Sequence, residues 1–172
     1  MRKTPPAFTV CLVGLLLLLS PLAANAAAAE SGQDELTRVV VAYELTMARV
    51  EAYGAVLAGI ADWADAHPEQ AKALRAQAPK GLADIDRAAA VLESEPALKA
   101  LFDKHQLSGR DFVLIPAVMM QARLAVLAEA QGRKLPPGQV NPKNLALART
   151  NAARMDAIMH QAAADRVRAF GR

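Results

Sequence analysis

The stretch SGRDFVLIPAVMMQARLAVLAEAQ, residues 108–131, decides the fold of this chain. Between Phe112 and Met120 it carries no charge, and its apolar side chains would fall on every face of a helix. A helix that is apolar all round is either buried in a protein core or spans a membrane. Gln121 and Arg123 end the apolar run well short of the roughly 20 residues that a membrane span needs. We therefore expect the buried central helix of a soluble helical bundle.

Two local features shape this central helix. Ser108 is a good N-cap, and Asp111, three residues later, completes a weaker form of the capping box. Pro116 lies inside the helix, where it has no N–H for the carbonyl of Phe112 and its ring crowds the preceding turn. We expect a kink at this proline, either as a detail of packing or as the wall of a pocket.

The first 26 residues have the three parts of a secretory signal peptide. Arg2 and Lys3 form a basic start, residues 11–19 form a short apolar core, and Ala24-Asn25-Ala26 is a small-x-small cleavage site. We expect cleavage after this site, which leaves residues 27–172 as one all-helical domain in the periplasm or secreted. An uncleaved membrane anchor is the alternative, and the shortness of the apolar run disfavours it.

Composition excludes several classes of function. Cys11 is the only cysteine, so the mature chain would have no thiol and no disulfide, and its stability would come from its core. Removal of Arg2 and Lys3 would leave 18 basic residues against 17 acidic ones, and only 4% of the residues are aromatic. A near-neutral protein with so few aromatic side chains is not expected to bind nucleic acid. We also expect no stable membrane insertion of the mature chain.

Apolar periodicity predicts two further long helices. Apolar residues recur with 4-3-4-3 spacing from Leu36 to Ala64, which indicates one helix over residues 33–66. A last helix is expected over residues 142–169, because Asn141 is a good N-cap and a proline follows it. With the central helix over residues 109–131 and shorter helices between, the fold class is all-α, an irregular up-and-down helical bundle with three long helices.

The charges of the first and last helices are opposite. Residues 30–66 hold seven acidic and two basic side chains, whereas residues 143–172 hold six basic and two acidic ones. Helices of opposite charge make favourable neighbours. We expect the two to pack side by side and antiparallel.

Catalytic motifs are missing from the sequence. There is no Gly-rich phosphate loop, H-E-x-x-H, G-x-S-x-G or C-x-x-C-H. Two close pairs of carboxylates, Asp84 with Asp86 and Glu93 with Glu95, are spaced so that their members do not share a helix face, and we expect them on the solvated surface. The sequence therefore predicts a non-enzymatic protein that binds a protein or small-molecule partner through a helical surface.

Methionine and histidine form the one arrangement that suggests a cofactor. Met155 and Met159 place two thioethers one turn apart, with the imidazole of His160 beside the second, and such ligands suit Cu(I). In an antiparallel pair of helices Met47 would lie level with His160, and these two side chains could ligate a non-covalent haem. Core packing is the plainer explanation, because methionine fills irregular gaps in cores. A copper or haem carrier is the alternative to a binding protein without a cofactor.

Overall fold

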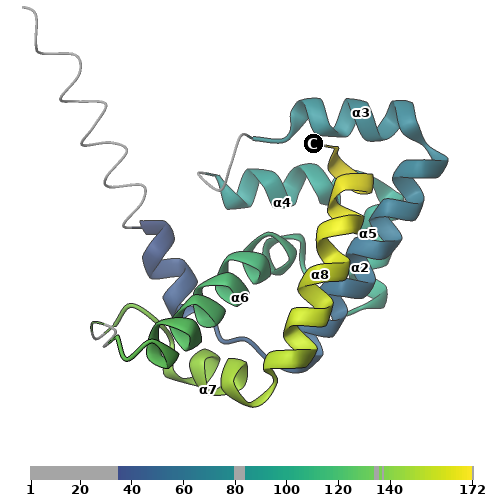
Figure 1. Ribbon diagram of the computed structural model, residues 1–172. Helices are drawn as coiled ribbons and strands as arrows, with labels where there is room; N and C mark the ends of the chain where they lie inside the picture. The colour runs from purple at the N-terminus through teal and green to yellow at the C-terminus, as the bar shows by residue number, and fades with distance from the viewer. Residues whose placement is uncertain (1–34, 80–83, 134–135, 137, 172) are drawn as a thin grey trace, which may run out of the picture.

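The computed structural model describes residues 35–79, 84–133, 136 and 138–171, and within them it contains helices joined by turns and no strand (Figure 1). The all-α class is confirmed for this part of the chain. A short helix over residues 35–42 is followed by seven more: α2 (Met47–Ala66), α3 (Pro68–Gln77), α4 (Ile85–Glu93), α5 (Pro96–Lys104), α6 (Gly109–Ala130), α7 (Pro142–Thr150) and α8 (Ala152–Phe170). The expected signal peptide and its cleavage site lie outside the described residues.

Helix α6 has the capping box that the sequence predicts. The Ser108 hydroxyl oxygen accepts a hydrogen bond from the Asp111 backbone N–H at 3.0 Å, and a carboxylate oxygen of Asp111 accepts one from the Ser108 N–H at 3.2 Å. One side of α6 lies in the core, but Met120, Leu124 and Leu127 are 48%, 57% and 49% exposed. The expectation of a helix buried on every face was therefore wrong. By length and composition alone α6 could cross a membrane, but the core helix of a soluble protein can have the same length and composition.

The long helix expected over residues 33–66 is interrupted at residues 43–46. Thr46 caps α2 through its hydroxyl oxygen, which accepts from the N–H of Arg49 at 3.3 Å. Asn144, reaching over from α7, accepts a hydrogen bond from the Leu45 N–H and donates one to the Tyr43 carbonyl, both at 2.8 Å. A buried polar side chain distant in sequence thus replaces the hydrogen bonds of a helical turn. The apolar spacing continues through the break, so periodicity alone did not reveal it.

The last helix is also divided, at Asn151. Its side-chain amide donates to the carbonyl of Leu147 at 3.0 Å, and its backbone leaves helical geometry (φ −116°, ψ 23°). Figure 1 shows the chain turning sharply there, so that α7 lies along α6 whereas α8 rises beside α2.

Helices α2 and α8 are parallel neighbours, and the antiparallel packing expected from the sequence was wrong. Near the start of both helices Arg154 pairs with Glu51 at 2.8 Å, and towards their ends Arg168 pairs with Asp62 at 2.8 Å. Residue numbers therefore rise together along the contact. The predicted pairing of an acidic with a basic helix is present. Charge alone does not determine direction, which follows from the turn at Asn151 that returns the chain to the start of α2.

The four carboxylates that lie close together in the sequence are exposed or half-buried, and each also binds another group of the protein. Asp84 and Glu95 cap α4 and α5, with side-chain oxygens that accept from backbone N–H groups at 2.9 and 3.3 Å. Asp86 pairs with Arg110. Glu93 accepts a 2.6 Å hydrogen bond from the N–H of the first residue of α6. These carboxylates therefore hold helix starts in place, a role that their spacing did not predict.

Candidate functional site

A pocket of about 190 Å³ opens between α6 and α8 at Pro116, the position where the sequence predicts a kink. Besides two alanines of α8, it is lined by Tyr53, Pro116, Met119, Met120, Met159 and Arg166. The two helices are joined beside it, where Arg123 of α6 forms two hydrogen bonds of 2.6 and 2.5 Å with Asp156, near the start of α8. The pocket is therefore a gap between two helices that side chains bridge.

Aromatic rings pack beneath the pocket. Tyr53, only 2% exposed, has its ring centroid 5.2 Å from that of Phe112, which lies one turn before Pro116. Phe112 in turn meets Phe102 edge-on at 5.5 Å. Such tilted and edge-on pairs are favourable for aromatic rings. Tyr53, which lines the pocket, is therefore held in place by the aromatic core.

The pocket contains one cation and one phenol. A guanidinium nitrogen of Arg166 donates to the hydroxyl oxygen of Tyr53 at 3.0 Å. Burial raises the pKa of Tyr53, and the neighbouring Arg166 only partly opposes this effect, so the phenol is neutral at physiological pH. Two hydrogen-bond donors thus meet at one wall of an otherwise apolar pocket.

The residues that the sequence suggested for copper are separated by burial. Met155 is fully buried in the core, Met159 is half-buried at the pocket, and His160 is exposed. The structure instead gathers Met159 with Met119 and Met120. Sequence analysis did not group these three, because their meeting depends on how α6 passes α8. The copper site stays a prediction; among the described residues no group of three or more His, Cys, Asp or Glu side chains is placed to hold a metal ion.

The haem hypothesis depended on antiparallel packing. Met47 is the first residue of α2 and is partly buried against the core. Because α2 and α8 are parallel, the antiparallel level that suggested this pair is absent. His160 is exposed, and the haem site stays a prediction.

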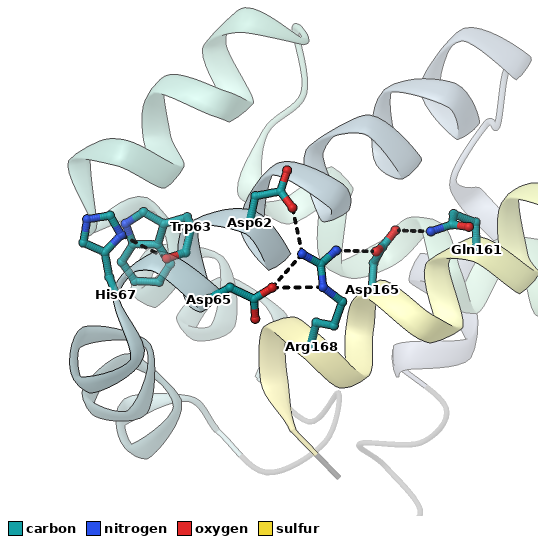
Figure 2. Close-up of polar contacts among 7 residues, drawn as sticks. All are labelled: Asp62, Trp63, Asp65, His67, Gln161, Asp165 and Arg168. Atoms are coloured by element: carbon teal, nitrogen blue, oxygen red, sulfur yellow. Dashed lines mark hydrogen bonds and ion pairs between the residues drawn. The ribbon is translucent and has the colours of Figure 1, made fainter.

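A second polar cluster lies at the far end of the α2 and α8 contact (Figure 2). Arg168 bonds Asp62 at 2.8 Å, Asp65 at 2.6 Å and Asp165 at 3.1 Å. Asp165 is buried, and its other oxygen accepts from Gln161 at 3.1 Å. All three carboxylates are engaged by one guanidinium, so this cluster joins the helices and offers no free acid and base.

Comparison of the chain with protein-family models, with curated proteins and with solved structures found no match. The chemistry of the pocket is therefore the basis for a function. Its lining groups can surround an apolar body and hydrogen-bond one polar group.

Proposed function

We propose that this protein is an exported, non-enzymatic binding protein that takes a small, largely apolar molecule into the pocket beside Pro116. The observation that carries the proposal is the meeting of Pro116 with the side chains of Met119, Met120 and Met159 around one opening. An apolar pocket with a few convergent polar groups is the usual form of a small-molecule site. Unbranched methionine side chains adapt to the shape of a guest.

The size of the pocket limits the guest. A dry cavity of about 150 Å³ holds benzene, whereas sites for drug-sized molecules begin at about 300 Å³. At about 190 Å³ this pocket suits a single ring or a short branched chain with one substituent.

Filling the pocket tests the proposal. Ala163 lines the pocket, and Ala164 beside it is exposed and does not line it. Small apolar compounds, screened by thermal melting, should raise the melting temperature of the wild type and of Ala164→Trp, because a ligand that binds only the folded state stabilises it. They should not stabilise Ala163→Trp. Equal stabilisation of both variants, or no stabilising compound, would overturn the proposal.

Export is a separate part of the proposal and rests on residues 1–26. The exported chain should begin at Ala27, and N-terminal sequencing of protein taken from the medium or the periplasm measures this. A start at Met1 together with retention in the membrane would contradict it.

A Cu(I) carrier is the second candidate, favoured by the three thioethers that line the pocket. The positive charge of Arg166 in the same lining opposes a cation, which is why we rank this function second. Metal analysis and an absorption spectrum of protein from its native compartment distinguish the two. Copper that Met159→Leu loses would support the carrier, because this change removes a thioether at nearly constant volume.

A further inference from the structure

The charge of Arg166 is not balanced by a carboxylate in the described part of the chain. The other two described arginines of α8 that face α2 are both ion-paired there, Arg154 with Glu51 and Arg168 with Asp62. Arg166 instead turns to the pocket and to the hydroxyl of Tyr53. Its surplus positive charge at the edge of an apolar pocket suits a ligand with one negative charge.

Tyr53 adds a second donor of the right kind. Its oxygen accepts from Arg166, and no described residue accepts the proton of its hydroxyl. The phenol is nearly inaccessible except through the pocket that it lines. A carboxylate placed here would accept from the guanidinium and from the phenol together, and hydrogen bonds to a charged group are about twice as strong as neutral ones.

The opposite walls define the rest of the ligand. Met119, Met120 and Met159 present three thioethers, and sulfur makes favourable contacts with aromatic ring edges at about 5 Å. The volume, about 190 Å³, exceeds that of a benzene-sized cavity by roughly the space of one small substituent. A flat ring with one carboxylate meets both conditions, whereas a long aliphatic chain exceeds the space.

We propose that the pocket binds a small aromatic monocarboxylate, of the size of benzoate, with its carboxylate on Arg166 and Tyr53 and its ring among the three methionines. This inference rests on the proposed binding function and specifies its ligand. The carboxylate distinguishes this ligand from neutral aromatic compounds of the same shape.

Titration calorimetry with benzoate and with benzamide, its neutral analogue of the same shape, tests the proposal. The wild type should bind benzoate about tenfold or more tightly than benzamide, the preference that a charge-assisted hydrogen bond supplies. Arg166→Gln should remove this preference, because it weakens benzoate binding much more than benzamide binding, and Arg166→Lys should restore part of it. Tyr53→Phe should weaken benzoate binding severalfold. Arg154→Gln, which breaks a surface ion pair away from the pocket, should behave as the wild type.

The possible results separate this inference from the function on which it rests. If both compounds bind equally and Ala163→Trp excludes both, the pocket binds ligands but the carboxylate proposal is wrong. If benzoate binds more tightly than benzamide by the same factor in the wild type and in Arg166→Gln, Arg166 does not bind the carboxylate and the proposal fails. If neither compound binds while other apolar compounds stabilise the wild type, only the ligand class is wrong. Failure of every compound overturns both. Because Arg166 is exposed, Arg166→Gln should fold, and its melting curve checks this.

Discussion

Asn144 should stabilise this fold more than any other single polar side chain at the break between residues 42 and 47. It is 1% exposed and comes from α7, about 100 residues after the backbone that it contacts. Its amide accepts from the N–H of Leu45 and donates to the carbonyl of Tyr43. Asn144→Leu keeps the branched shape and the number of heavy atoms of the side chain and removes both hydrogen bonds, so it measures their worth without opening a cavity.

The magnitude follows from the two backbone groups that lose their partner. A buried backbone group without a hydrogen bond costs about 1–3 kcal/mol. The Leu45 N–H is buried and has no second acceptor in the described structure, so it loses this amount in full. The Tyr43 carbonyl is partly buried and keeps a long hydrogen bond of 3.4 Å from Asn141, so it loses less. We expect a loss of about 2–4 kcal/mol, or roughly 6–12 °C in melting temperature for a domain of this size.

Urea denaturation monitored by circular dichroism measures this loss, with Asn151→Leu as the matched control. Asn151 is half-exposed, and its side chain makes one local hydrogen bond within the last helical segment, so the same substitution there should cost about 1 kcal/mol or less. If the free energy of unfolding of Asn144→Leu is within 1 kcal/mol of the wild-type value, or is no lower than that of Asn151→Leu, the hydrogen bonds at the break do not stabilise the fold and the reasoning is refuted.

Three further predictions concern the helix starts, the packing direction and acid stability. Glu93→Ala should lower the free energy of unfolding by about 1–3 kcal/mol, measured by thermal melting, because the N–H of Gly109 loses its acceptor. Cysteines at 54 and 158, in a chain without Cys11, should crosslink on mild oxidation, since a Cβ on Gly54 would lie 3.3 Å from the Ile158 side chain. Burial works against ionisation of Asp111, but hydrogen bonds from Ser108 and Tyr43 hold its pKa below the ordinary value. The ionised carboxylate therefore stabilises the fold at neutral pH, and this stabilisation is lost as the pH falls through the lowered pKa. Asp111→Asn should be less stable than wild type at pH 7, with the difference shrinking below about pH 4.

Each of these has its own control. The variant Glu69→Ala, at an exposed residue in the first turn of α3, should melt as wild type, and a Glu93→Ala protein that does the same contradicts the first prediction. Cysteines at 43 and 162 should not crosslink, and crosslinking of that pair alone would mean that the helices are antiparallel. Asp103→Asn, at an exposed residue paired with Lys99, should leave the pH dependence of stability unchanged. If the stability of Asp111→Asn changes with pH as that of wild type does, Asp111 does not cause the loss of stability in acid.

Local sequence signals predicted the elements of this fold well. The capping residues Ser108 and Asn141, with the apolar runs that follow them, predict helices whose starts agree with α6 and α7. Those signals act within one or two turns of the chain, and this is why they are legible in a sequence. The breaks at residues 43–46 and at Asn151 were missed because a distant partner stabilises the first, and the second keeps an apolar pattern on both sides.

The site was less accessible to sequence reasoning than the helices. The kink at Pro116 was expected, and its position in a pocket lining was named as one of two possibilities. Arg166 and Tyr53 were missed, since they are 113 residues apart and meet only through the packing of α8 on α2. The number of charges gave no signal, since α8 has three arginines and α2 has three acidic residues. Arg166 is left without one of them because Arg168 pairs with both Asp62 and Asp65.

The polar contacts around the pocket indicate that it exists before a ligand enters. Two helices with only apolar side chains between them would close until their surfaces touched, because apolar contact is favourable and lacks direction. Here Arg123 and Asp156 join α6 to α8 on one side of the gap. Arg168 fixes the far end of α8 to α2, and the aromatic ring of Phe112 supports the floor. These contacts set the separation of the helices. The methionines line the gap between them with side chains that can change rotamer without movement of the backbone. A ligand that enters therefore has little structure to reorganise, so more of its contact energy remains as affinity.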